Sequence, residues 1–123
     1  DPKGARDQSI VGIVSLAGNS VVTSGIYERG FVLHGVCYHH ILNPETGLPS
    51  DSDLVSATLV MTSSMDADAL ATACIVMGSE KAIQMLEANG LDALLIREDG
   101  QLVYTQGFVE KYDYMAYEDF VNR

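Results

Sequence analysis

Residues 54–78 have the sequence LVSATLVMTSSMDADALATACIVMG, and the change of period within this stretch decides the fold. The first eight residues, Leu54–Met61, are mostly apolar or β-branched, which predicts a strand with at least one buried face. From Met65 to Val76 small and apolar residues recur at helical spacing, with Ser63 or Ser64 as the N-cap. The stretch therefore predicts a strand that leads directly into a helix.

A second helix follows at once. Gly78 ends the first helix, and Ser79 is predicted to cap a helix over Glu80 to Ala88 that Asn89-Gly90 closes. Other apolar runs bounded by turn residues predict antiparallel hairpins. These are 9–16 with 20–23 around 17–19, 31–34 with 36–39 around Gly35, and 91–96 with 101–104 around 98–100.

The elements together predict an α+β fold, in which antiparallel hairpins form a sheet with two adjacent helices packed on it. The segment Asn43 to Asp53 is dense in Pro, Gly, Ser and Asp, so we expect a loop there. The aromatic tail from Lys111 to Arg123 is expected to be either a short docking helix or an end that faces a partner.

The composition is that of one modest acidic domain. The 123 residues include 7 Lys and Arg against 17 Asp and Glu, for a net charge of −10. Such a surface repels phosphate backbones, which argues against nucleic-acid binding, while a hydrophobic fraction of 47% excludes a disordered acidic tail. Two cysteines cannot build a disulfide framework or a four-thiolate zinc site, and Cys74 is expected to be a small buried core residue.

One candidate functional segment is HHILNPETGLP at His39–Pro49, where histidines at the end of a strand precede a turn restricted by two prolines. A backbone held in this way can present N–H groups to phosphate oxygens. His40 can donate a hydrogen bond or accept a proton near neutral pH. The same pattern also fits a plain turn that carries surface histidines.

A second candidate is the pair Asp68 and Thr72, which lie four residues apart and therefore on one face of the predicted helix. A carboxylate and a hydroxyl, completed by water and a phosphate, suit Mg²⁺. Asp66 points elsewhere and is better explained by helix capping and the helix dipole. The alternative for the pair is an ordinary acid near the helix start and a Thr that bonds its own backbone.

A third segment, TSGIYER at Thr23 to Arg29, is either a close-approach turn after a strand or a plain hairpin corner. These segments, in this order and with Leu54–Val60 and Asp66–Ala73, resemble the ApbE family of FAD:protein FMN transferases. The resemblance covers most of residues 1–108. It implies Mg²⁺-dependent transfer of FMN from FAD to a Ser or Thr of a target protein, with release of AMP; some members act instead as FAD pyrophosphatases.

The resemblance also assigns residues. The metal ligands of the family's helix motif fall on Asp68 and Thr72, and its flavin-contacting loop falls on His40, Leu42, Thr46 and Gly47. His40 is the expected catalytic base that helps to deprotonate the acceptor hydroxyl. The implied cofactors and partners are FAD, as substrate, Mg²⁺ and a flavin-acceptor protein.

Two substitutions depart from the family pattern: Ile26 stands where an Asp is common, and Asn43 replaces the Asp before Pro44. Family members are more than twice as long, so residues 1–123 are expected to be the C-terminal portion of the domain without its upstream half. Such a portion can expose core surface and self-associate to cover it. A non-catalytic flavin-binding or assembly module is the alternative function. The expected location is extracytoplasmic, periplasmic or at the cell surface, with a lipid anchor on a segment outside this sequence.

Overall fold

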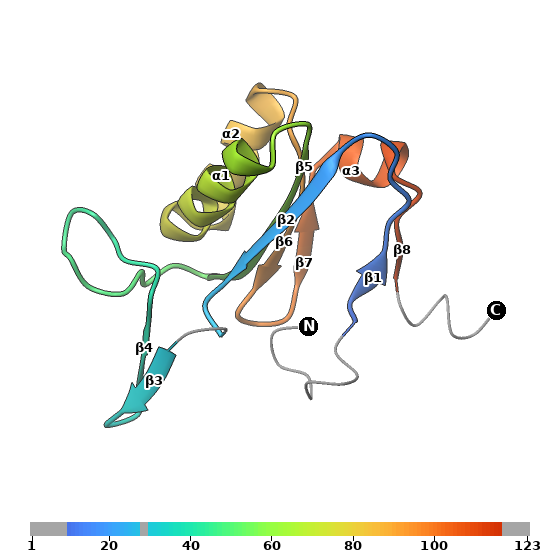
Figure 1. The fold of residues 1–123 in the computed structure, drawn as a ribbon. Helices are drawn as coiled ribbons and strands as arrows, with labels where there is room; N and C mark the ends of the chain where they lie inside the picture. Colours follow the sequence, from blue (N-terminus) through green and yellow to red (C-terminus); the bar gives the residue numbers. More distant parts are fainter. Residues whose placement is uncertain (1–9, 28–29, 117–123) are drawn as a thin grey trace.

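The computed structural model describes residues 10–27 and 30–116, which form one four-stranded antiparallel sheet and two short ribbons (Figure 1). The strand order in the sheet is β2-β5-β6-β7, while β1 pairs with β8 and β3 pairs with β4. In chain order the elements are β1 (Gly12–Ile13), β2 (Ser20–Gly25), β3 (Gly30–Leu33), β4 (Val36–His39), β5 (Leu54–Met61), α1 (Ser64–Met77), α2 (Ser79–Ala88), β6 (Asp92–Arg97), β7 (Leu102–Tyr104), α3 (Gln106–Lys111) and β8 (Met115–Ala116).

The predicted α+β fold is confirmed, with both helices on one face of the sheet. α1 packs on β2 and β5, and α2 packs on β6 and β7. Between these layers lies the main core, in which Ala67 and Ala71 of α1 and Ala57 of β5 are fully buried. The predicted N-cap is also correct, because the Ser63 hydroxyl accepts the Asp66 N–H at 3.2 Å.

The other face of the sheet carries a smaller core that the sequence analysis does not anticipate. Phe108 of α3 packs there against Val60 and Leu94, and Figure 1 shows α3 on the opposite side of the sheet from α1 and α2. The buried Asp92 carboxylate accepts hydrogen bonds from Lys111 Nζ at 3.0 Å and from the Tyr112 hydroxyl at 2.9 Å. The described part of the tail is therefore docked within the chain, and 117–123 lie outside the described residues.

Strand pairing corrects one predicted hairpin. Gly18 turns the chain with φ +77°, but β2 pairs with β5 from Ser20↔Met61 to Gly25↔Ser56, and β1 pairs with the distant β8. The reason is burial: β5 is the long buried strand, and pairing with it brings Val22 against the main core. The turn at Gly18 reverses the chain locally, but it does not determine which strand pairs with β2.

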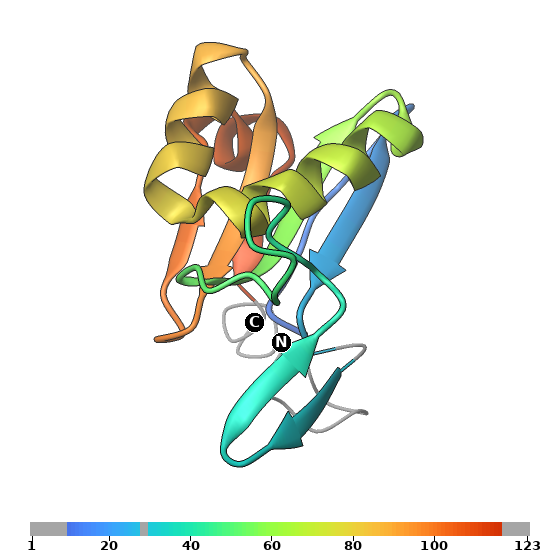
Figure 2. The same ribbon diagram turned by 90° about the vertical axis from the view of Figure 1, so that its left-hand side faces the viewer.

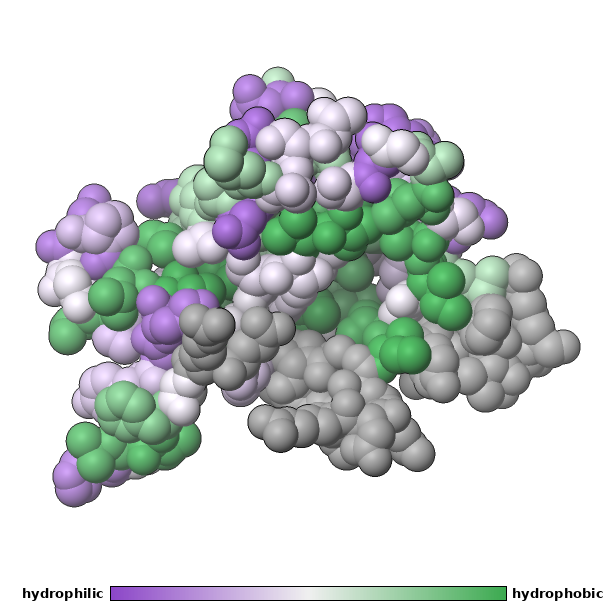
Figure 3. Space-filling model, viewed as in Figure 1, coloured by the Kyte–Doolittle hydropathy of each residue, from purple (hydrophilic) through white to green (hydrophobic). Residues whose placement is uncertain are grey.

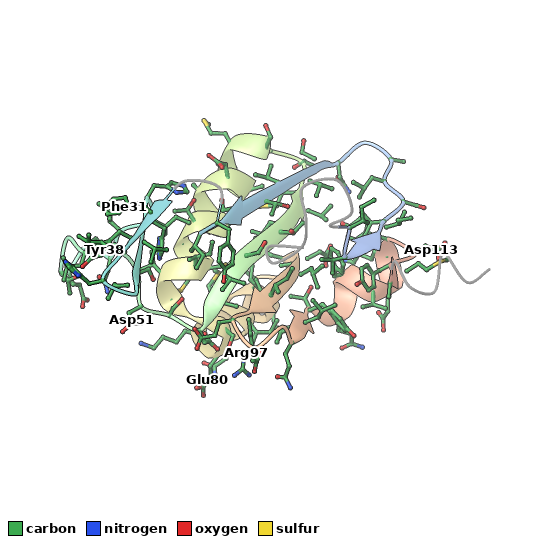
Figure 4. The ribbon with its side chains drawn as sticks, turned by 90° about the horizontal axis from the view of Figure 1, so that it is seen from below. Phe31, Tyr38, Asp51, Glu80, Arg97 and Asp113 are labelled. Atoms are coloured by element: carbon green, nitrogen blue, oxygen red, sulfur yellow. The ribbon has the colours of Figure 1, made fainter. Side chains whose placement is uncertain are left out.

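The other two predicted hairpins are confirmed as β3–β4 and β6–β7. His34 and Gly35 have φ values of +50° and +77°, the positive pair that a tight two-residue turn requires. The β3–β4 hairpin stays apart from the main sheet and projects from the body of the molecule (Figures 1 and 2). Figure 4 shows Phe31 and Tyr38 side by side on it, stacked at a centroid distance of 5.3 Å.

Two smaller expectations have different outcomes. Cys74 is fully buried as predicted, and burial raises the pKa of its thiol to about 11, which makes it unreactive at neutral pH.

Ser79 is not the N-cap of α2, because Gly78 holds that position. Ser79 is the first residue of the helix, and its N–H donates to the Asp53 carboxylate. No helix within the described ranges is both long and apolar enough to span a bilayer.

Gly107→Ala tests the packing of α3. A Cβ at residue 107 would collide with the Asp92 carboxylate and lie 3.2 Å from Lys111 Nζ. Although Ala normally favours a helix over Gly by about 1 kcal/mol, we expect the free energy of unfolding in urea to fall by about 1–3 kcal/mol. Glu110→Ala, an exposed change on the same helix, is the control. A Gly107→Ala protein as stable as the unsubstituted one would contradict this account.

Candidate functional site

The outward edge of α1 carries both predicted metal ligands. The buried side chains Ala67, Ala71 and Ile75 face the sheet, and this leaves Asp68 and Thr72 exposed. The Thr72 hydroxyl donates to the backbone carbonyl of Asp68 at 3.2 Å, which is the ordinary role that the sequence left open. The same hydroxyl also contacts a side chain of the neighbouring strand β2.

Ser24 of β2 is the residue that the sequence analysis missed. Its Oγ lies 3.3 Å from Thr72 Oγ1, so β2 contributes a second hydroxyl to the α1 pair. Side chains alternate along a strand, and Ser24 therefore faces the helix together with Val22. The signal was present in the Thr23-Ser24-Gly25 segment, but it has meaning only once β2 is known to lie beside α1.

The donor chemistry of this cluster fits Mg²⁺. Asp68 offers a carboxylate, and Ser24 and Thr72 offer hydroxyls, all hard oxygens. Among the described residues no three His, Cys, Asp or Glu side chains gather as a metal site. Mg²⁺ does not need such a cage, since it usually keeps several waters and shares one or two carboxylates with substrate phosphates. Asp66 lies in the first turn of α1, as expected of a capping residue.

The loop after β4 is a closed structure held by its own backbone. Asn43 N–H donates to the Leu48 carbonyl and Gly47 N–H to the Asn43 carbonyl, both at 2.8 Å. The Asn43 side chain accepts the Glu45 N–H at 2.9 Å, so Asn keeps the turn that the family's Asp would form. Gly47 has φ +70° and open space where a Cβ would be.

The loop displays the predicted flavin-contact residues on its surface. His40, Leu42, Thr46 and Gly47 are all exposed, Leu42 to 52%. The Thr46 hydroxyl accepts the Leu48 N–H at 3.2 Å. His39 is instead buried, so the two adjacent histidines have different environments and only His40 faces outward.

Two hydrogen bonds attach the loop to α1. The hydroxyls of Ser50 and Ser52 both donate to the carbonyl oxygen of Ile75, the former at 3.2 Å. Ile75 lies within one turn of Thr72, and Figure 2 shows the loop crossing beside the C-terminal half of α1. The structure thus brings the predicted loop and the predicted metal pair to the same helix.

Asp53 ends the loop in a charged network. Its carboxylate accepts the Ser79 N–H at 2.8 Å and the Ser79 hydroxyl, and it lies 3.4 Å from Arg97 Nε. Burial alone would raise the pKa of Asp53, but the Ser79 hydrogen bonds and the Arg97 charge outweigh it and hold the pKa below its ordinary 3.8.

Asp53→Asn tests this network. A carboxyl whose folded pKa is depressed stabilises the fold above its unfolded pKa, and that contribution disappears as the pH falls through the folded pKa. We therefore expect the variant to unfold more readily at pH 7, with the difference narrowing below about pH 3.8. Urea denaturation across this range measures it. A stability difference that does not change with pH would show that the charge of Asp53 is not involved.

Comparisons with known proteins identify the family of this chain. The model of the ApbE family matches residues 1–95. An FAD:protein FMN transferase of Treponema pallidum is 46% identical over 112 residues, covering 90% of this chain and 31% of the relative. One from Klebsiella pneumoniae is 37% identical, covering 80% of this chain and 32% of the relative.

Solved structures give the same relationship. The ApbE protein of Thermotoga maritima superposes with a TM-score of 0.78 at 37% identity, covering 88% of this chain and 35% of that one. The flavinyl transferase ApbE of Pseudomonas stutzeri superposes with a TM-score of 0.66 at 33% identity, covering 85% and 37%. The chain spans about a third of the length of the curated relatives it matches. On the family match and these likenesses, the chain belongs to the ApbE family.

Proposed function

We propose that this chain carries flavin- and magnesium-binding parts of an FAD:protein FMN transferase, which moves FMN from FAD to a Ser or Thr hydroxyl of an acceptor protein and releases AMP. The observation that carries the proposal is the attachment of the loop 40–53, through Ser50 and Ser52, to the helix that bears Asp68 and Thr72. The names of its relatives support the reaction class.

Within this proposal the loop binds the dinucleotide. Gly47 leaves room for close approach of a phosphate, and Leu42 offers an exposed apolar side chain to an aromatic ring. His40 is exposed on the same loop, where an imidazole nitrogen can accept the proton of the acceptor hydroxyl. Binding by the loop would thus place the acceptor hydroxyl, His40 and the pyrophosphate together.

Asp68 and Thr72 would hold the magnesium ion, with the Ser24 hydroxyl beside them. A bound Mg²⁺ would polarise the phosphoryl oxygens and stabilise the charge that develops as the pyrophosphate is cleaved. Asp68 is the only one of the three groups with a formal charge, so we expect its removal to weaken metal binding most.

Asp68→Ala tests the proposal directly. We expect FAD binding to the unsubstituted chain to tighten with Mg²⁺, and the Mg²⁺-dependent part to fall by at least about 10-fold in the variant, because the one anionic ligand is lost. Titration followed by flavin fluorescence measures both affinities. Asp66→Ala is the matched control, since it removes an equal charge from the same helix at a position outside the cluster.

The outcomes separate the candidates. Mg²⁺-dependent FAD binding that Asp68→Ala and Asp66→Ala reduce equally would refute the metal assignment. AMP release that requires an acceptor protein would support the transferase, and release without one would favour an FAD pyrophosphatase. Mg²⁺-dependent binding without any AMP release would favour a flavin-binding module.

Self-association is a further part of the proposal, with the β3–β4 hairpin as the contact. Phe31, Val32, Leu33 and Val36 are each at least half exposed there, and Figure 3 shows hydrophobic surface over this hairpin. Two-stranded ribbons are marginal by themselves and gain stability when another surface covers them.

Val32→Lys tests the hairpin contact. We expect the mass of the unsubstituted chain, measured by light scattering, to rise above 13.3 kDa with concentration, and the variant to remain monomeric because a charge enters the apolar contact. Val109→Lys is the control, because it places the same charge on an exposed apolar position of α3, outside the hairpin. Equal association of both variants would exclude the hairpin as the contact.

A further inference from the structure

The base of the loop is bridged by a buried histidine. His39 is 7% exposed, and the Ile41 N–H donates to its Nδ1 at 3.3 Å. Since Nδ1 accepts, the proton of the neutral imidazole lies on Nε2. Nε2 is 3.1 Å from the carbonyl oxygen of Ser50, to which it donates. One side chain therefore connects the residue that enters the loop with the residue that leaves it.

Ser50 is also the point at which the loop meets α1. Its N–H donates to the Ile41 carbonyl at 2.8 Å, and its hydroxyl donates to the Ile75 carbonyl. The imidazole of His39 supplies the remaining partner, at the Ser50 carbonyl. Ile41 is buried in the main core, so the polar backbone groups around it need internal partners. His39 thus completes the set of bonds that holds the loop against the helix.

We propose that His39 is a positioning residue for the flavin loop: the hydrogen bond from its Nε2–H across the loop to Ser50 fixes His40, Thr46 and Gly47 relative to Thr72. Adjacent residues at the end of β4 point to opposite sides, so His39 is buried and His40 is exposed. In this proposal His39 fixes the position of the loop, and His40 faces the ligand. The inference rests on the proposed function of the loop.

Three substitutions separate the two hydrogen bonds of His39. His39→Leu removes both. His39→Asn retains a short acceptor for the Ile41 N–H, in the manner of an Asx turn, but cannot reach Ser50. His39→Gln retains a donor that reaches Ser50 but no ring nitrogen beside Ile41. Since the proposal assigns the positioning to the bond with Ser50, Gln is the rescuing variant and Asn is not.

Amide hydrogen exchange in the 123-residue chain, without ligand, is the first measurement. We expect exchange at the Gly47 and Ser50 amides to accelerate about 10- to 100-fold in His39→Leu and His39→Asn, and less than about 3-fold in His39→Gln. The amide of Leu59 in β5 exchanges through global unfolding, which also breaks the bridge, so its exchange should accelerate by no more than that of the loop amides. His34→Asn, at the exposed tip of β3–β4, is the matched histidine control.

The outcomes decide the role of the bridge. Acceleration of the loop amides in His39→Leu and His39→Asn, with rescue by Gln, supports the proposal. Unchanged loop exchange in His39→Leu overturns it. Greater acceleration at Leu59 than at the loop amides also overturns it, because the substitution would then disturb contacts of the core that loop opening leaves intact. Rescue by Asn in place of Gln would assign the effect to the local turn at Ile41 and would likewise overturn it.

FAD with Mg²⁺ provides the second arm, which tests the function on which the inference rests. In the unsubstituted chain FAD should slow exchange at Gly47, and His39→Asn should weaken FAD binding about 10-fold while His39→Gln binds FAD normally. Absence of any FAD-induced protection would refute the proposed function and the positioning role with it, whereas the ligand-free exchange still reports whether His39 closes the loop. Normal FAD affinity in a variant with an opened loop would overturn the positioning role alone.

Discussion

The buried central strand β5 is the constraint on which the rest of the structure depends. It pairs with β2 on one edge and β6 on the other, and both of its faces are covered. The loop enters β5 at its start, and α1 leaves shortly after its end. Eight strand residues span about 26 Å and a 14-residue helix about 21 Å, so a helix that folds back over the strand ends near the strand's beginning. The C-terminal turns of α1 therefore return to the loop.

Small residues set how closely that helix returns. Ala67 and Ala71 of α1 and Ala57 of β5 are fully buried at the contact. Their size lets α1 lie close enough to the sheet for Thr72 to reach Ser24 at 3.3 Å. A larger side chain at Ala71 would displace the helix, because tightly packed interiors do not absorb added volume without movement. The same core residues thus determine both the stability of the fold and the spacing of the hydroxyl cluster.

The sequence predicts the parts of this arrangement that are local. Period, caps and turns identify β5, α1, the β6–β7 hairpin and the loop, since each signal lies within the element itself. It does not predict that β1 pairs with β8, because a two-residue strand carries no pattern that selects its partner. For the same reason Ser24 could not be joined to Thr72, although Asp68 and Thr72 could be joined by helical spacing alone. Short α3, with Gly107 near its start, also lacks a helical signal.

The two ends of the loop between β4 and β5 are held in different ways, and this difference bears on how the candidate site is built. The exit is attached to the body of the fold through Ser52, which bonds the end of α1, and through Asp53, which bonds the start of α2. The entry comes from β4, whose hairpin stands apart from the main sheet. Movement of that hairpin would displace the loop unless the first residues of the loop are also fixed. Ile41 fixes them by packing in the main core. The hydrogen bond from His39 to Ser50 fixes them by linking the start of the loop to its end. The position of the loop is therefore determined by the core and by α1, and it does not require a fixed hairpin.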